Sequence, residues 1–185
     1  SRCSNKSRPR ENELKNQLLS FVNTGALRNN ETIVTNTRHY DSLLKALEEI
    51  QKVKEPQTWL VITEGWCGDA AQNLPVINKM AELNDQIDLK LVLRDENLAL
   101  MDLFLTNGGS AIPKLIVLDK ESNVINTWGP RPTVATNMVA AYKAEHGSLD
   151  ADFKQDLQVW YNKNKGKSTQ EDFVNLLKNT MAKEL

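Results

Sequence analysis

A cysteine placed between a strand-like run and a helix-like run constrains this chain more than any other feature. Residues 58–63 are rich in Trp, Val and Ile, which is typical of a buried strand. Trp66, Cys67 and Gly68 come soon after, and apolar residues at helical spacing follow them. A thiol at the start of a helix meets free backbone N–H groups and the positive end of the helix dipole. The pattern therefore predicts a reactive cysteine with a lowered pKa.

Composition narrows the class of protein. The 185 residues, of which 40% are hydrophobic, are enough for one domain with its own core. The net charge of −1 gives no electrostatic argument for nucleic acid as a partner. No apolar run reaches the roughly 18 residues that span a membrane. The polar, basic start of the chain shows no secretory signal. We therefore expect a cytoplasmic protein that binds neither nucleic acid nor membrane.

The chain has two cysteines, Cys3 and Cys67, and two histidines, His39 and His146. Two cysteines do not make a disulfide framework, which favours a reducing compartment. No group of these residues has the spacing of zinc ligands, so we expect no metal. A reactive thiol needs no organic cofactor for its own chemistry, so we expect none. Cys3 lies in a polar segment, and it could act as a distant second thiol if that segment is long and mobile.

The hydrophobic pattern divides the chain into a disordered tail over residues 1–10 and a single domain over residues 11–185. Residues 11–37 are expected to form an N-terminal helical extension, and residues 133–185 are expected to form C-terminal helices. The expected elements between them are a helix capped by Asp41 and ended by Pro56, a strand at 58–63, a helix at 67–81 containing Pro75, a strand at 87–93, a short helix at 95–105, and strands at 115–118 and 124–128. This order indicates an α/β layer fold with a mixed sheet.

Several motifs, in this order, resemble the thioredoxin family. Trp66-Cys67-Gly68 follows the buried strand, Pro75 stands eight residues after the cysteine, and Ile112-Pro113 precedes a later strand. Together with Leu93-Arg94-Asp95-Glu96-Asn97 and Thr106-Asn107-Gly108-Gly109, they are similar to a bacterial thioredoxin-like subfamily that usually reads Trp-Cys-Gly-Asp-Cys. The resemblance covers about residues 58–128. It implies a thioredoxin-like fold whose central mixed sheet is flanked by helices, here with extra helices at both ends.

The sequence departs from that family pattern at two positions. Ala70 stands where the resemblance implies a resolving cysteine, and Val61 stands at about the place of a buried aspartate. A dithiol enzyme attacks a disulfide with its first thiol and releases the mixed disulfide with its second. With Ala70, the second step has no reagent within the motif.

The resemblance also implies a substrate-binding site around the cysteine. Trp66 would flank the thiol at the surface, Pro113 would be cis, and the backbone of Ile112 would pair with an extended substrate chain. Arg131 would approach Cys67 from the third loop of the site and offset the charge of Asp69. The expected site is Cys67 as the catalytic residue with Trp66, Gly68, Asp69, Ile112, Pro113 and Arg131 as substrate-binding residues.

Plainer interpretations of these residues stay open at this point. Cys67 could be buried and inert, Trp66 could be a core aromatic, and Arg131 could be a solvated loop residue. Asp69 would stabilise the helix N-terminus, although its charge would also raise the pKa of the nearby thiol.

The leading functional hypothesis is thiol–disulfide exchange by a single thiol, in which an external thiol completes the reaction. The expected partner is a protein disulfide or a low-molecular-weight thiol. One alternative is a non-catalytic binding module that keeps the groove but has lost turnover. Another is a monothiol glutaredoxin-like protein that uses glutathione or an iron–sulfur cluster, since Cys67-Gly68-Asp69-Ala70 has the Cys-Gly-x-small pattern of that group.

Overall fold

The computed structural model describes residues 44–183, and it describes side chains for residues 46–180. The strands are β1 (Gln57–Thr63), β2 (Ile87–Leu93), β3 (Lys114–Leu118) and β4 (Val124–Trp128). The helices are α3 (Leu44–Gln51), α4 (Gly68–Ala81), α5 (Leu98–Met101), α6 (Thr133–His146), α7 (Ala151–Asn164) and α8 (Lys167–Lys183). The expectations for the tail at 1–10, the extension at 11–37 and the Asp41 cap lie outside the described residues.

The four described strands form one mixed sheet in the order β2-β1-β3-β4. β1 pairs in parallel with β2, while β3 pairs antiparallel with both β1 and β4. β1 is therefore central, and it is buried along nearly its whole length. A strand covered on both faces reads as a continuous apolar run, which is why residues 58–63 stand out in the sequence.

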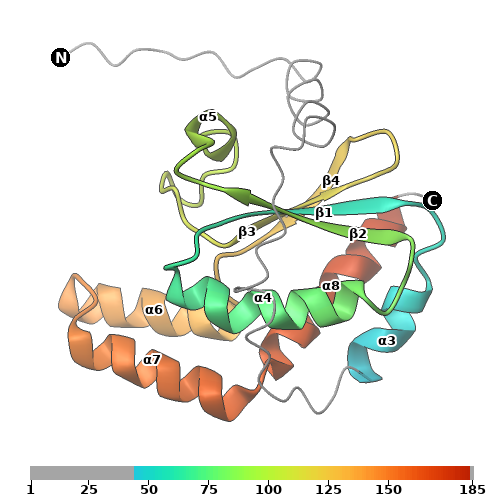
Figure 1. Cartoon of the computed structure of the whole chain (residues 1–185). Helices are drawn as coiled ribbons and strands as arrows, with labels where there is room; N and C mark the ends of the chain where they lie inside the picture. The colour runs from blue at the N-terminus through green and yellow to red at the C-terminus, as the bar shows by residue number, and fades with distance from the viewer. Residues whose placement is uncertain (1–43, 184–185) are drawn as a thin grey trace.

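Helices cover both faces of this sheet (Figure 1). One face carries α3, α4 and α8, and its core includes Trp59, Leu74 and Phe173. The other face carries α5, and its core includes Leu60, Met101 and Ile116. Alternate residues of β1 and β3 supply the two cores, as the pleat of a strand requires. The expected α/β class with a mixed sheet is confirmed.

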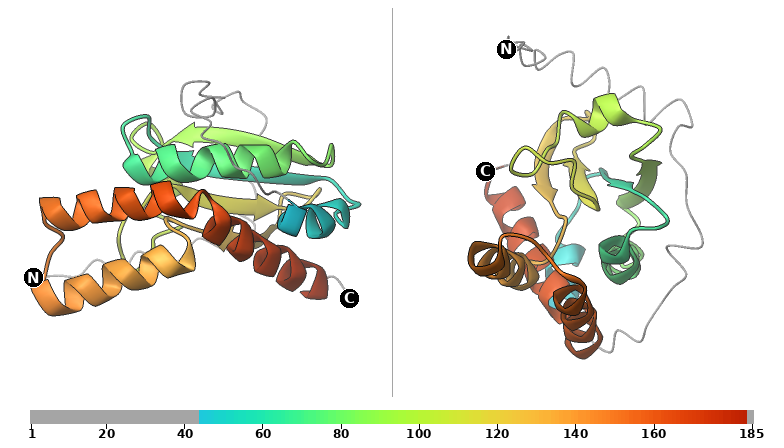
Figure 2. Two further views of the ribbon diagram at one scale, coloured as in Figure 1. Left: turned by 90° about the horizontal axis from the view of Figure 1, so that it is seen from below. Right: turned by 90° about the vertical axis from the view of Figure 1, so that its left-hand side faces the viewer.

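The C-terminal helices are part of the same folded unit. α6 and α7 form an antiparallel pair with a small core of its own, and α7 runs between α4 and α6 (Figure 2). α8 then returns to the sheet, where Phe173 packs against Trp59 and Trp128 at centroid distances of 5.4 Å each. Three aromatic rings thus join the last helix to the first and last described strands.

Two helices are shorter than the sequence predicts. α3 ends at Gln51 rather than at Pro56, because the Asn84 side chain donates hydrogen bonds to the carbonyl groups of Ile50 (2.8 Å) and Val53 (2.9 Å). α5 begins at Leu98 rather than at Asp95, whose N–H donates to the Glu64 carboxylate at 2.8 Å. At α3 the Asn84 side chain binds carbonyl groups that a longer helix would use. At α5 the Glu64 carboxylate holds the backbone of Asp95 in the turn that precedes the helix.

None of the helices in the described part of the chain combines the length and the apolar character needed to cross a lipid bilayer.

Candidate functional site

Cys67 stands at the junction of β1 and α4, as the sequence predicts. It is the N-cap residue of α4 and has extended backbone angles. The Ala70 N–H donates to its Sγ at 3.5 Å, and the Sγ–H donates to the Ile112 carbonyl oxygen at 3.4 Å. The residue is partly exposed and packs against both cores of the sheet. Cys67 is therefore not fully buried, and its reactivity stays a prediction.

The pKa of Cys67 is raised above its ordinary value, so the lowered pKa expected from the sequence is wrong in direction. Burial is the largest cause, and the charge of Asp69 adds to it. The N–H groups of Ala70 and Asp69 and the charge of Arg131 act in the opposite direction but do not outweigh burial. A helix start stabilises a thiolate, whereas loss of water around sulfur destabilises it, and here the second effect is larger.

The peptide bond between Ile112 and Pro113 is cis, as the resemblance implies. A second cis bond, which the sequence did not indicate, joins Gly129 to Pro130 in the loop after β4. The two segments lie against each other: a Cβ added to Gly129 would come within 2.2 Å of the Pro113 carbonyl oxygen. Gly129 also has φ of +118°, so its lack of a side chain allows this close approach. Arg131 follows Gly129 and Pro130 directly in the chain.

Trp66 lies at the surface with 66% of its area exposed, so it is not a core aromatic. The guanidinium carbon of Arg94 lies 5.1 Å from the centroid of its ring, a distance typical of a cation–π contact. Arg94 also pairs with Asp95 at 2.8 Å. Trp66 thus presents a fixed apolar surface beside Cys67.

Arg131 pairs with Asp69, so it is not a free loop residue. The Arg131 Nε donates to Oδ1 of Asp69 at 3.0 Å, and the Arg131 Nη2 lies 2.7 Å from Oδ2. The Tyr161 hydroxyl donates to Oδ1 at 2.9 Å. The side chain of Asp69 is only 14% exposed, so these bonds are poorly accessible to water. The expected pairing of Arg131 with Asp69 is therefore present. The hydrogen bond from Tyr161 of α7 to Asp69 was not predicted.

Ala70 is fully buried one turn beyond Cys67. Its backbone N–H donates a hydrogen bond to the Cys67 sulfur, so the side chain of a cysteine at position 70 would start close to the first thiol. Gly68 lies against α7, since a Cβ added there would meet the Gln158 side chain at 3.5 Å. The catalytic role of Cys67 stays a prediction, as do the substrate-binding roles of Trp66, Gly68, Asp69, Ile112, Pro113 and Arg131.

Sequence reasoning missed the residues of α7 and α8 that reach the site. Asn73 donates to Tyr161 at 3.2 Å and accepts from Thr169 at 2.8 Å, and Gln72 donates to Gln158 at 2.9 Å. Phe153, Leu157 and Tyr161 recur at helical spacing in the sequence, and they share one small core in the structure. Hydrophobic periodicity indicates which face of a helix is buried, but it does not indicate which other element packs against that face.

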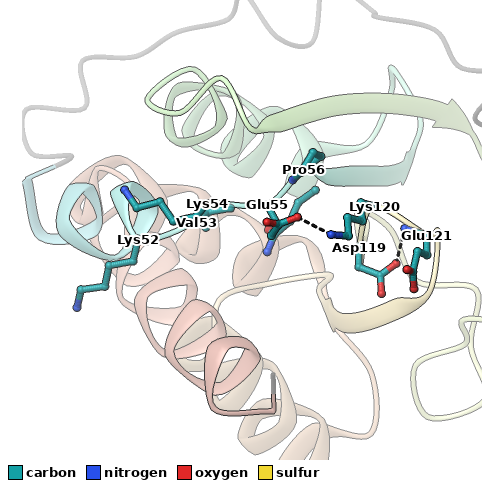
Figure 3. Close-up of a pocket in the computed structure, with 9 residues that line it drawn as sticks. Lys52, Val53, Lys54, Glu55, Pro56, Asp119, Lys120 and Glu121 are labelled. Carbon is teal, nitrogen blue, oxygen red and sulfur yellow. Dashed lines mark hydrogen bonds and ion pairs between the residues drawn. The ribbon is translucent and has the colours of Figure 1, made fainter. Parts of the chain in front are cut away.

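Among residues 46–180, no three His, Cys, Asp or Glu side chains are grouped so that they could hold a metal ion. A surface hollow of about 400 Å³ lies at the opposite end of β1 from Cys67, where Gln57 begins the strand. Figure 3 shows the ion pair between Glu55 and Lys120, 2.7 Å apart, within this hollow. Its lining mixes charges of both signs and gives no preference for a ligand.

The family comparison agrees with this geometry. The model of the family described as thioredoxin matches residues 16–143, which is more than half of the chain. The chain belongs to the thioredoxin family. The match includes β1, Cys67, the cis-Pro113 loop, Arg131 and most of α6, and it ends before α7 and α8. Tyr161 and Thr169 therefore lie beyond the part that the family model describes.

Two solved structures share the fold of this thioredoxin-family chain. An HIV epitope scaffold and a protein of unknown function from Pseudomonas aeruginosa each superpose with a TM-score of 0.54. Each comparison covers 91% of this chain and 84% of the other chain, at 18% and 17% identity respectively. Identity at this level supports the fold alone.

A short stretch of the chain is similar to another kind of protein. It is 95% identical over 42 residues to the tRNA modification GTPase MnmE of Flavobacterium johnsoniae and 74% identical over 43 residues to that of Christiangramia forsetii. The stretch is 23% of this chain, which spans only 9% of the length of these curated relatives.

Proposed function

We propose that Cys67 carries out thiol–disulfide exchange by a monothiol route. The observation that carries the proposal is the position of its Sγ, which is partly exposed, at the start of α4, and 3.4 Å from the Ile112 carbonyl oxygen beside cis-Pro113. A disulfide in an extended segment lying along this loop would bring one sulfur to Cys67. Trp66 would supply an apolar surface for the neighbouring residues of that segment.

The proposed reaction uses two equivalents of an external thiol. The Cys67 thiolate attacks one sulfur of the substrate disulfide, a new S–S bond forms, and the other half of the substrate leaves as a thiolate. One external thiolate then attacks the Cys67 sulfur and releases the first half. A second external thiolate frees Cys67, so that two external thiols are oxidised to a disulfide and the substrate is reduced to two thiols.

The raised pKa of Cys67 sets the expected speed. A free thiol is only a few per cent ionised at pH 7, and a raised pKa reduces that fraction further. The proposed exchange is therefore slow at neutral pH and faster in alkaline solution. The proposed partner is a protein disulfide or a low-molecular-weight thiol. We assign the activity to the cytoplasm because the chain has only two cysteines and no disulfide framework.

Reduction of insulin disulfides by dithiothreitol tests the proposal. The wild-type chain is expected to accelerate the reaction above the rate of dithiothreitol alone, and Cys67→Ser is expected to give no acceleration. Ala70→Cys is expected to exceed wild type, because it restores a second thiol beside the first. A wild-type rate equal to that of Cys67→Ser would contradict the proposal.

A second candidate, a binding module without turnover, is favoured by two observations. Burial keeps the Cys67 thiol protonated, and Ala70 provides no second thiol. In this case only Ala70→Cys would reduce insulin. Wild type and Cys67→Ser would then bind a reduced, alkylated insulin chain with equal affinity, which isothermal titration calorimetry would measure.

A further inference from the structure

The Asp69 carboxylate, two residues after Cys67, is held by side chains from two other parts of the chain. Arg131, in the loop before α6, binds both carboxylate oxygens: its Nε lies 3.0 Å from Oδ1 and its Nη2 lies 2.7 Å from Oδ2. Tyr161, near the end of α7, donates its hydroxyl proton to Oδ1 at 2.9 Å. Charge-assisted bonds of this kind are stronger than neutral ones. The carboxylate is therefore fixed in place.

The hydroxyl of Tyr161 is oriented by a buried network. Asn73 donates one amide hydrogen bond to the Tyr161 oxygen at 3.2 Å and another to the Asp69 carbonyl at 2.8 Å. The Asn73 oxygen accepts from the Thr169 hydroxyl at 2.8 Å. Tyr161, Asn73 and Thr169 are 6%, 0% and 2% exposed. Since the Tyr161 oxygen accepts from Asn73, its own proton is directed to Asp69.

The titratable group in the network of Tyr161, Asn73 and Thr169 is the tyrosine hydroxyl. Burial and the charge of Asp69 raise the pKa of Tyr161, so the hydroxyl keeps its proton. The charged groups that act on Cys67 are Asp69 from its own helix and Arg131 from the loop before α6. A residue that fixes the Asp69 carboxylate against the Arg131 guanidinium therefore affects the net electrostatic effect of the two charges on the Cys67 thiol.

We propose that Tyr161 is a positioning residue for Cys67, because its hydroxyl fixes the Asp69 carboxylate against Arg131 and thereby sets the reactivity of the thiol. The inference rests on the proposed function only in treating Cys67 as the reacting group. It gives α7 a chemical role at the site that its residue Tyr161 reaches. Tyr161 acts through its hydrogen bond to Asp69.

Loss of the hydroxyl should make Cys67 less reactive. Without it, the Asp69 oxygen loses one of its donors, so more of its negative charge acts on the thiol and the thiolate is disfavoured. Replacement by Phe keeps the ring that packs against Trp160 with its centroid 5.1 Å away. A change of about half a pKa unit corresponds to about a threefold lower alkylation rate below the pKa.

The test is the rate of Cys67 alkylation by iodoacetamide between pH 6 and pH 10, in a Cys3→Ser background so that one thiol reacts. Tyr161→Phe is expected to react about threefold more slowly than its parent at pH 7 and at the same limiting rate at high pH. In an Asp69→Asn background the same substitution is expected to leave the rate unchanged. Equal slowing in both backgrounds, or no slowing in either, would overturn the inference.

A matched control separates this effect from the loss of any Tyr–Asp bond. Tyr142 donates to Asp150 at 2.5 Å at the α6–α7 turn, and Tyr142→Phe is expected to leave the alkylation profile unchanged. Should Tyr161→Phe fail to fold by circular dichroism, Thr169→Val takes its place. That change removes the hydroxyl that orients Asn73 and is expected to slow alkylation in the same direction by less than threefold; an unchanged rate would count against the inference.

Alkylation requires no disulfide partner, so the two proposals fail separately. A chain inactive in insulin reduction that still shows the dependence on Tyr161 would contradict the exchange reaction alone. An active chain indifferent to Tyr161 would contradict the positioning role alone.

Discussion

At the scale of single residues, Cys67 experiences two opposed effects. The start of α4 supplies N–H donors, which favour the thiolate, and partial burial removes water, which favours the thiol. The charges of Asp69 and Arg131 also oppose one another. Burial is the largest contribution, so the folded protein holds the proton on sulfur more tightly than free cysteine does. Reactivity therefore increases as pH rises toward and beyond the ordinary thiol pKa.

Removal of the carboxylate at residue 69 should increase that reactivity. Asp69→Asn abolishes the negative charge that raises the Cys67 pKa, and it should increase the alkylation rate at pH 7 by about three- to tenfold. Alkylation kinetics in the Cys3→Ser background measure the change. Asp152→Asn, which removes an exposed acidic residue from the first turn of α7, serves as the control and should have no effect. A slower reaction of Asp69→Asn would show that the carboxylate supports the thiolate instead.

A side chain at Gly129 should destabilise the fold. In Gly129→Ala, the new Cβ would lie 2.2 Å from the Pro113 carbonyl oxygen at a residue with positive φ. Gly147→Ala is a matched control because that residue also has positive φ, +79°, with no atom within 4 Å of the Cβ. Urea unfolding should give a loss of about 1 kcal/mol for the control and at least about 3 kcal/mol for Gly129→Ala. Equal losses would contradict the argument from close approach.

At the scale of elements, α8 joins the end of the sheet to the start of α6. The Asp172 carboxylate accepts from the Trp128 ring N–H at 2.9 Å, the Thr133 N–H at 2.9 Å and the Thr133 hydroxyl at 3.2 Å. It satisfies an N–H of the first turn of α6, whose own N-cap residue, Pro132, makes no side-chain cap bond. A residue of one helix thus caps another across the sequence.

Loss of this cap should weaken the whole fold. Asp172→Ala leaves the ring N–H of Trp128, a residue only 8% exposed, without its acceptor, and should reduce the free energy of unfolding by about 2 to 3 kcal/mol. Asp156→Ala, at an exposed position of α7, should change it by less than about 0.5 kcal/mol. Chemical unfolding followed by tryptophan fluorescence compares the two. A small effect of Asp172→Ala would mean that water replaces the carboxylate.

At the scale of the whole molecule, the α/β fold class and the residues around Cys67 could be predicted from the sequence, whereas the contacts from α7 and α8 could not. The strand at 58–63 and the position of Cys67 follow from local patterns, and the role of Ile112-Pro113 follows from the resemblance to thioredoxins. β1 and β3, which are paired in the sheet, bring them together. The sign of the Cys67 pKa shift could not be predicted, because burial of the sulfur depends on residues packed around it from several elements. The bonds of Tyr161, Asn73 and Thr169 join residues as far as 96 positions apart, and no local pattern records them.

The central claim is that this chain presents one slow but competent thiol. Its most direct test is the single-turnover reaction of the Cys3→Ser protein with 2,2′-dipyridyl disulfide from pH 6 to pH 10, followed by released thiopyridone. We predict one equivalent released from Cys67, at a rate that rises with pH and has its inflection above the pKa of free cysteine, and none from Cys67→Ser. A rate already at its plateau by pH 7, or no release at any pH, would contradict the account.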